Sequence, residues 1–213
     1  MTRIRAHSIF LSLDGYGAGP DQDADNPLGV GGQRMTSWIF ATARGRQMIG
    51  GEGGTTGIDD AWLRRGDDNI GATVMGRNMF GPVRGPWPDY EWRGWWGEEP
   101  PYHHPVFVLT HHERPPLEMT GTTFHFVTDG LDRAIALASE AADGQDVRIG
   151  GGVSTLRQAL SIGVVDEIHV AVTPVVLGAG ERLWDPAGAW PRGYTLVERE
   201  ASDAVTHYRF ERS

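Results

Sequence analysis

The chain has 213 residues and a formal net charge of −9, with 39% hydrophobic and 22% charged residues. These values predict a globular protein without long disorder. The acidic balance argues against nucleic acid as a partner, and the absence of cysteine and lysine excludes disulfides, thiolate catalysis, a P-loop lysine and a Schiff base. No apolar run approaches the ~18 residues of a membrane span. We therefore expect a soluble, cytoplasmic protein that does not bind membranes.

Apolar runs separated by turn residues predict alternating strands and helices in the first half of the chain. A segment at 81–105, rich in tryptophan and proline, follows neither period and is expected to be a long loop. The other elements expected here are a strand at 4–13, a loop at 15–34, a helix at 36–48, a flexible break at 50–57, a short helix from Asp59 or Asp60 to Arg65, and a strand at 70–75.

The second half continues this alternation and closes with an antiparallel pair. No linker composition divides the chain, so we predict one domain over 1–213. The expected elements are strands at 106–110 and 124–127, a helix from Asp129 or Gly130 to about Ala142, a strand at 147–149, a helix capped by Ser154 or Thr155 up to Gly163, a strand at 166–176, and paired strands at 194–200 and 206–211.

The strongest local motif is a glycine run between a strand and a helix start. Glycines let a phosphate approach the backbone, and the free amides and dipole of a helix start favour an anion. A tight turn that needs positive φ explains the same glycines equally well. The candidate anion site consists of Gly150, Gly151, Gly152, Val153, Ser154 and Thr155.

Two further strands end in glycine or polar residues. The strand at 70–75 runs into Gly76 and Arg77, and the strand at 106–110 ends in Thr110 and His111. Arg77 is placed to bind a phosphate or to form a surface ion pair, and both remain open. Because ligands of α/β sheets bind at the carboxyl ends of strands, three such ends predict one ligand cleft.

Asp14 follows the first strand in the sequence Ser12-Leu13-Asp14-Gly15. It is either a turn former, as Asp-Gly pairs commonly are, or a carboxylate at the mouth of the cleft. Adjacent histidines, at 103–104 and 111–112, point to opposite faces when they lie on a strand. We therefore expect no metal site.

The aromatic side chains of segment 81–105 have two interpretations. They stack on a planar heterocycle, or they form a hydrophobic flap that packs on the domain or on a second subunit. Together with the apolar stretch at 170–177, the segment predicts a homodimer.

Several motifs together resemble the dihydrofolate reductase-like proteins, in the branch related to the reductase domain of riboflavin biosynthesis. The motifs span most of the chain, and their order and spacing carry the resemblance. They are Ser12-Leu13-Asp14-Gly15, Val74-Met75-Gly76-Arg77, Val106-Phe107-Val108-Leu109-Thr110, Ile149-Gly150-Gly151-Gly152, Val165-Asp166-Glu167 and Thr173-Pro174-Val175-Val176-Leu177-Gly178.

The resemblance implies an α/β fold with a mixed, mostly parallel sheet of about eight strands flanked by helices, and NADPH as the cofactor. In this layout the pyrophosphate lies along the glycine run up to Thr155. The adenosine phosphate lies at Gly76, Arg77, Thr110 and His111, and the nicotinamide is covered by the loop that contains Gly17 and Ala18.

The resemblance also implies that Asp14 lies where the nicotinamide and substrate meet, and that the helix carrying Trp38 contacts the substrate. Dihydrofolate reductases have an acid on this helix and the present chain has none, so folate reduction is not expected. The absence of cysteine excludes the zinc deaminase that is fused to the riboflavin enzyme.

Two functions remain open. The first is an NADPH-dependent reductase of a small polar heterocyclic or carbonyl substrate, similar to 5-amino-6-(5-phosphoribosylamino)uracil reductase. The second is a nucleotide-binding protein of the same fold without catalysis.

Overall fold

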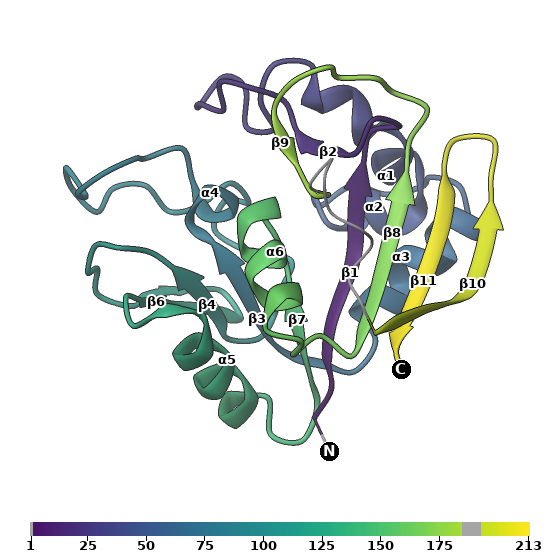
Figure 1. Cartoon of the computed structure of the whole chain (residues 1–213). Coiled ribbons are helices and arrows are strands. Elements are labelled where there is room, and N and C mark those ends of the chain that lie inside the picture. Colours follow the sequence, from purple (N-terminus) through teal and green to yellow (C-terminus); the bar gives the residue numbers. More distant parts are fainter. Residues whose placement is uncertain (1, 185–192) are drawn as a thin grey trace.

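The computed structural model describes residues 2–184 and 193–213, in which helices flank one large sheet (Figure 1). The sheet has nine strands in this part of the chain. Their order is β10 (Tyr194–Ala201), β11 (Thr206–Arg212), β8 (Glu167–Val172), β1 (Ile4–Leu11), β7 (Asp146–Ile149), β3 (Ile70–Gly76), β4 (Val106–Leu109), β6 (Thr122–Val127) and β5 (Leu117–Met119).

The pairings from β8 through β6 are parallel, and those of β10, β11 and β5 are antiparallel. A small second sheet pairs β2 (Tyr16–Ala18) with β9 (Glu181–Arg182). The predicted mixed, mostly parallel sheet is confirmed, with one strand more than expected. Because the central strands are parallel, β1, β7, β3 and β4 all end at the upper edge of the sheet in Figure 1.

Helices cover both faces of the large sheet. In Figure 1, α5 (Gly130–Ala141) and α6 (Val153–Ser161) lie in front of it, whereas α1 (Ser37–Ala41), α2 (Ala43–Gln47) and α3 (Ile58–Asp67) lie behind. A 3₁₀ turn at Gly32–Met35 precedes α1, and the short helix α4 (Arg77–Phe80) follows β3.

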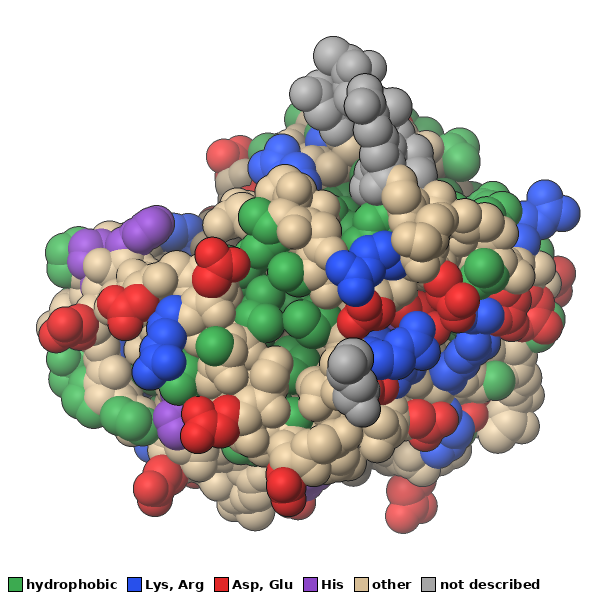
Figure 2. Space-filling view, turned by 60° about the horizontal axis from the view of Figure 1, so that its bottom comes forward, with side chains coloured by type: hydrophobic (Ala, Val, Ile, Leu, Met, Phe, Trp, Pro, Cys, Tyr) green, Lys and Arg blue, Asp and Glu red, His purple; other side chains and the backbone are tan. Residues whose placement is uncertain are grey.

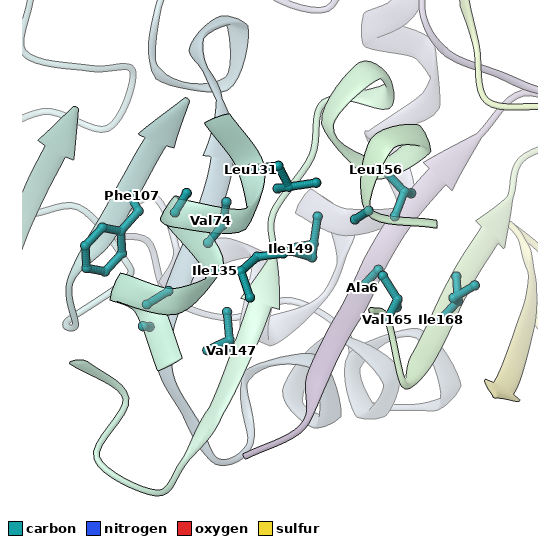
Figure 3. Close-up of a cluster of buried hydrophobic side chains, with 14 of the residues drawn as sticks. Ala6, Val74, Phe107, Leu131, Ile135, Val147, Ile149, Leu156, Val165 and Ile168 are labelled. Carbon is teal, nitrogen blue, oxygen red and sulfur yellow. The ribbon is translucent and has the colours of Figure 1, made fainter. Parts of the chain in front are cut away.

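The main hydrophobic core lies between the sheet and α5 and α6 (Figure 3). Val147 and Ile149 of β7 are fully buried there, close to Leu131 and Ile135 of α5. Successive side chains of a strand point to opposite faces, so Arg148 lies on the face that carries α1 to α3. This alternation places the polar side chain of Arg148 on the face covered by α1 to α3, where a cavity lies.

The single helix predicted at 36–48 is wrong, because the chain breaks at Thr42. Thr42 has an extended backbone, with φ −81° and ψ 159°, and its Oγ1 accepts a hydrogen bond of 2.9 Å from the Gly45 amide. The hydroxyl therefore caps α2, as threonine often does at a helix start. Gly45 lies directly against the Ile39 carbonyl, where a Cβ has no room, and this close approach lets α2 turn away from α1.

Other boundaries were displaced by a residue or a few. β1 ends at Leu11 and β8 at Val172, short of the expected 13 and 176. Beyond these strand ends the two segments are still joined by a hydrogen bond from the Leu13 amide to the Val175 carbonyl. Strands β2, β5 and β9 were not predicted, since two or three residues are too few to show a period. Segment 81–105 contains no helix or strand, as predicted.

The tryptophan-rich segment is anchored to the sheet by Arg114. This side chain is 7% exposed, and its Nη2 donates to the carbonyls of Tyr90 and Trp92 at 3.0 and 2.7 Å. Its guanidinium also lies 4.8 Å from the centre of the Trp87 ring, a cation–π distance. The segment therefore packs on its own domain at this point, which supports the flap interpretation for Trp87 and Trp92.

We expect Arg114→Met to lower the free energy of unfolding by roughly 1.5–3 kcal/mol, because two carbonyls lose a charged donor. Urea denaturation followed by tryptophan fluorescence measures this. Arg93→Met is the matched control, since Arg93 forms an exposed pair with Glu98 in the same segment and such pairs contribute about 0–1 kcal/mol. Equal losses in the two variants would contradict the anchoring role.

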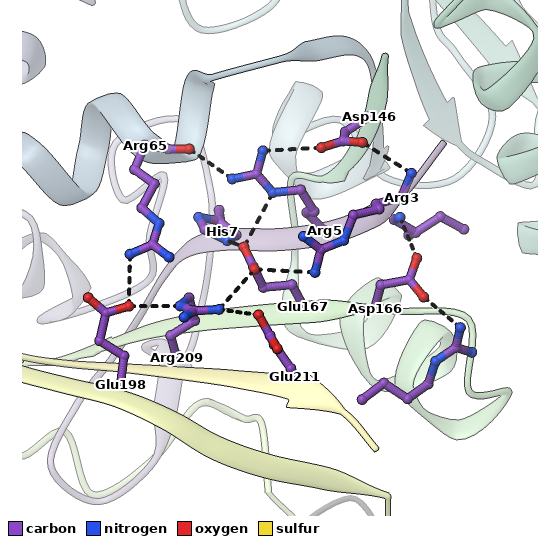
Figure 4. Close-up of polar contacts among 12 residues, drawn as sticks. Arg3, Arg5, His7, Arg65, Asp146, Asp166, Glu167, Glu198, Arg209 and Glu211 are labelled. Carbon is purple, nitrogen blue, oxygen red and sulfur yellow. Dashed lines mark hydrogen bonds and ion pairs between the residues drawn. The ribbon is translucent and has the colours of Figure 1, made fainter. Parts of the chain in front are cut away.

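A buried carboxylate joins β1 and β11 through β8 (Figure 4). Glu167 is 4% exposed and pairs with Arg3, Arg5 and Arg209 at 3.1–3.4 Å, and also with Nε2 of His7. Burial alone raises the pKa of this carboxyl, but the His7 hydrogen bond and the arginine charges outweigh burial and lower it well below its usual range. Glu167 therefore stays ionised and holds three strands in register.

A directional hydrogen-bond chain lies beside this network. The Ser8 amide donates to Nδ1 of His169 at 3.1 Å, so the neutral ring carries its proton on Nε2. That nitrogen lies 3.0 Å from Nδ1 of His207, whose Nε2 lies 2.9 Å from Oδ1 of Asp59. The Ser8 amide thus fixes which ring nitrogen carries the proton in both His169 and His207. Ser8 has a positive φ of 57° at a bulge in β1, and the chain holds this bulge in place.

Burial lowers the pKa of His7, His169 and His207 below the usual 6.5. The unfolded chain therefore binds protons near pH 6 that the folded chain does not, and stability falls as the pH decreases below 6.5.

Each of the three histidines contributes a loss of up to about 1.4 kcal/mol per pH unit. We expect urea denaturation at pH 7.5, 6.0 and 5.0 to show this steep loss, which precedes the titration of ordinary carboxylates. His169→Gln should reduce the slope, whereas the exposed His111→Gln should not. A stability that is constant from pH 7.5 to 5.0 would refute the assignment.

Charges of both signs are interspersed on the face of the molecule seen in Figure 2. Hydrophobic side chains gather between them, and the coloured residues form no continuous basic surface on this face. Among the described residues, no helix has the length and apolar character needed to cross a bilayer.

Candidate functional site

The glycine run lies against the end of β3, as the cleft hypothesis requires. The Gly76 amide donates to the Gly151 carbonyl at 2.7 Å. A Cβ on Gly76 would lie 2.6 Å from Oγ1 of Thr155, so no larger residue fits without a shift. Gly151 has a φ of 95°, which favours glycine. The close approach thus requires glycine at position 76, and the positive φ favours it at position 151.

Helix α6 begins at Val153, and its cap residue is Gly152 without a capping side chain. The predicted cap by Ser154 or Thr155 is therefore wrong. Amides of the first turn of this nine-residue helix remain open to a ligand, and the helix dipole favours an anion there. The glycine run thus retains the properties of an anion site.

The loop that was expected to cover the nicotinamide also lies at the start of α6. Gly17 and Ala18 belong to β2, and a Cβ on Gly17 would lie 2.6 Å from Cγ2 of Val153. Ala18 is buried, at 5% exposure. The structure therefore brings the loop onto the start of α6.

The guanidinium of Arg77 has donors that no hydrogen bond uses. Its Nη1 lies 3.4 Å from Oγ1 of Thr110, whereas its Nε and Nη2 are buried and have no hydrogen-bond partner. The guanidinium lies 3.7 Å from the centre of the Trp87 ring. Burial lowers the pKa of Arg77, and the charges of Arg84 and Arg114 lower it further. A half-buried cation with two unused donors and cationic neighbours is suited to an anionic ligand.

His111 is exposed and no contact joins it to Arg77 among the described residues. Thr110 instead bonds to the main chain of His112 at 3.2–3.3 Å, and the His112 carbonyl accepts the indole N–H of Trp87 at 3.0 Å. His111 as a cofactor residue stays a prediction, and the contacts at this strand end come from its neighbours.

Asp14 connects two loops. Its Oδ1 and Oδ2 accept the amides of Leu177 and Gly178 at 3.1 and 2.7 Å, and its carbonyl accepts the Arg182 guanidinium. Burial raises the pKa of this carboxyl, but the hydrogen bonds from Ser12 and the two amides outweigh burial and lower it to about 2. This placement supports the turn interpretation, and a catalytic role for Asp14 stays a prediction.

We expect Asp14→Asn to lower the free energy of unfolding, because asparagine offers one acceptor where the carboxylate offers two. Urea denaturation above pH 4, where the wild-type carboxylate is ionised, measures the loss. The same variant tests the catalytic role: a fall in turnover of about 10²-fold at unchanged NADPH affinity supports it. Unchanged turnover would leave Asp14 as a loop anchor only.

A cavity of about 380 Å³ lies on the sheet face that carries α1 to α3. Its floor is formed by the strand residues Phe10, Met75 and Arg148 and by Gly150, which directly follows β7. Its other walls come from the loop at 27–28, from the three helices and from the tryptophan-rich segment, whose Trp95, Trp96, Pro101 and Tyr102 line it. A pocket of this size accommodates a small organic molecule.

Trp38, the predicted substrate residue, is 3% exposed and packs edge-on against His207 at 5.5 Å. It is not among the residues that line the cavity, whereas Thr36, Ile39 and Phe40 of the same region are. Contact between Trp38 and a substrate stays a prediction, and its neighbours are better placed.

Three ionisable residues that sequence reasoning missed meet in the cavity wall. Asp67 accepts Nε of Arg44 at 2.6 Å and Nη1 of Arg148 at 2.7 Å. They come from α2, the end of α3 and β7, so nothing in their local sequences signals that they meet. His7 also lines the cavity, and its Nδ1 is buried without a partner.

A family profile described as the RibD C-terminal domain matches residues 6–206. The chain belongs to this family. A search of curated proteins found no match. The RibD C-terminal family thus accounts for nearly the whole chain, which confirms the resemblance drawn from the motifs.

Solved structures with the same fold agree with this assignment. A protein from Shewanella sp. PV-4 that is assigned to riboflavin biosynthesis has a TM-score of 0.61 and 22% identity, over 100% of this chain and 99% of that one. The dihydrofolate reductase of Enterococcus faecalis, complexed with NADP(H) and RAB-propyl, has a TM-score of 0.53 and 12% identity, over 99% and 96% of the two chains.

A third similar structure is the diaminohydroxyphosphoribosylaminopyrimidine deaminase/5-amino-6-(5-phosphoribosylamino)uracil reductase of Thermotoga maritima. It has a TM-score of 0.54 and 14% identity, and the match covers all of this chain but 57% of that one. At these identities the likeness is one of fold.

Proposed function

We propose that this RibD C-terminal family protein is an NADPH-dependent reductase of a small polar heterocyclic or carbonyl compound. The observation that carries the proposal is Arg77, whose buried Nε and Nη2 have no partner beside a glycine run that is open to an anion. NADPH differs from NADH by a 2′-phosphate, and a half-buried arginine with free donors is suited to that group. Family membership supports the same activity.

The residues that would hold the cofactor fit its chemistry. The open amides at the start of α6 suit a pyrophosphate, and Gly76 leaves space where a Cβ would collide with Thr155. Gly17 and Ala18 would cover the cofactor from β2. NADPH supplies a hydride when bound, and the protein's own part is to align the rings and exclude water.

The cavity is the proposed substrate site. Gly150 belongs both to the glycine run and to the cavity floor, so the two sites adjoin. Met75 and Met79, which also line the cavity, lie at the end of β3 and in α4, next to the proposed phosphate residues. This adjacency supports transfer between a cofactor on the run and a substrate in the cavity.

We expect Arg77→Gln to weaken NADPH binding at least tenfold and to change NADH binding little, because only NADPH carries the 2′-phosphate. Isothermal titration calorimetry with both cofactors measures this. Arg133→Gln on the exposed side of α5 is the control and should change neither affinity. Wild-type protein that binds neither cofactor would refute the proposal, and equal losses for both would assign Arg77 to the pyrophosphate.

A nucleotide-binding protein without catalysis is the second candidate. The observation that favours it is the cavity wall, where the one carboxylate among the described lining residues, Asp67, is held by two arginines. Both oxygens of this carboxylate therefore already accept a guanidinium hydrogen bond. A screen of NADPH oxidation with pyrimidine, pterin, flavin and quinone compounds decides between the two. Binding of NADPH without oxidation by any of them would favour the second candidate.

The predicted homodimer stays a prediction. Val176 in the expected apolar stretch is 60% exposed, and Leu196 and Val197 on the edge strand β10 are 48% and 43% exposed. These side chains are available for an interface.

A further inference from the structure

The cavity wall contains one cluster of charged side chains among residues that are mostly apolar. Arg44 and Arg148 lie on either side of Asp67, which pairs with both. Two guanidinium groups and one carboxylate leave one positive charge in excess. An uncompensated charge beside apolar walls is costly, and a bound anion would compensate it.

The two arginines also have unused donors. Arg44 uses its Nε for Asp67, and Arg148 uses Nη1 for Asp67 and Nε for Oγ1 of Thr73 at 3.4 Å. Among the described residues no acceptor is paired with the terminal nitrogens of Arg44 or with Nη2 of Arg148. The side chains are 21% and 16% exposed, so a ligand can reach them. The carboxylate of a ligand would accept from both.

The walls around this region suit a flat ring system. Phe10, Phe40, Trp95, Trp96 and Tyr102 line the cavity with aromatic faces and edges. Aromatic rings prefer stacked or edge-on contacts with other aromatic rings. The cavity therefore favours a planar aromatic body over a sugar.

The charged cluster lies close to the glycine run. Arg148 is on β7, Gly150 follows the last residue of that strand, and both line the cavity. Two residues of extended chain span at most roughly 7 Å. An aromatic carboxylate placed on the arginines would thus have its ring near the cofactor end at Gly150.

We propose that the substrate is a planar aromatic compound with one carboxylate group, and that Arg44 and Arg148 bind this carboxylate. The inference rests on the proposed function in one respect, that the bound acid is the molecule reduced. A single excess positive charge matches a monoanion, whereas a phosphomonoester dianion would leave a negative charge uncompensated near Asp67.

Calorimetry with three probes of the same ring system tests the proposal: 2-naphthoate, neutral 2-naphthamide and 2-naphthyl phosphate, each added to the full chain. We expect 2-naphthoate to bind at least tenfold more tightly than the amide, because charged donors favour a charged acceptor. Arg44→Gln and, separately, Arg148→Gln should reduce this preference to less than threefold. Arg64→Gln is the matched control, because Arg64 pairs with Asp60 on α3 and does not line the cavity.

Four results would overturn the proposal: equal binding of the acid and the amide, a preference that survives in both cavity variants, at least tenfold tighter binding of the phosphate, or no binding of any probe at millimolar concentration. NADPH is titrated separately. Protein that prefers 2-naphthoate but binds no NADPH would keep the carboxylate site and reject the reductase. Protein that binds NADPH but shows no carboxylate preference would do the reverse.

Discussion

The hydrogen bond between the Gly76 amide and the Gly151 carbonyl joins the carboxyl ends of β3 and β7, and the arrangement of the candidate site depends on it. Two glycines permit this arrangement, because a Cβ on Gly76 would meet Thr155 at 2.6 Å and Gly151 has a φ of 95°. It sets the start of α6 next to Arg77. It also sets Gly150 into the floor of the cavity, so that the proposed phosphate and substrate regions share one edge of the sheet.

The tryptophan-rich segment contacts both the proposed phosphate region and the cavity. Its first part places Trp87 against Arg77, and its last part places Trp95 and Trp96 in the cavity wall. Arg114 holds the middle through the carbonyls of Tyr90 and Trp92. A segment without helix or strand is thus fixed by side-chain donors and ring packing, and its aromatic side chains lie in two different surroundings. Trp87 and Trp92 pack on the domain, and Trp95 and Trp96 are available to a ligand.

The chain retains the fold of its structural relatives at 12–22% identity. The sheet and its glycine contacts depend on backbone geometry, which many sequences can satisfy. The cavity wall depends on individual side chains, and here it combines aromatic rings with two arginines around Asp67. Fold and cofactor region can therefore be shared with relatives while the substrate differs.

The mostly parallel sheet was expected from the resemblance of several motifs to a known family. The sequence by itself determined the alternation of strands and helices and the glycine run at a strand end. These features are local, because the period of apolar residues and the conformational freedom of glycine act over a few positions. It also located Arg77, since an arginine directly after a strand and a glycine stands out. The tertiary structure alone decided that Thr42 divides the helix predicted at 36–48, which sets Arg44 beside Asp67. It likewise decided that Arg148 faces the cavity and that Trp38 lies in the core. Such contacts join residues tens of positions apart, and they form only where folding of the whole sheet and its helices brings those side chains within a few ångströms.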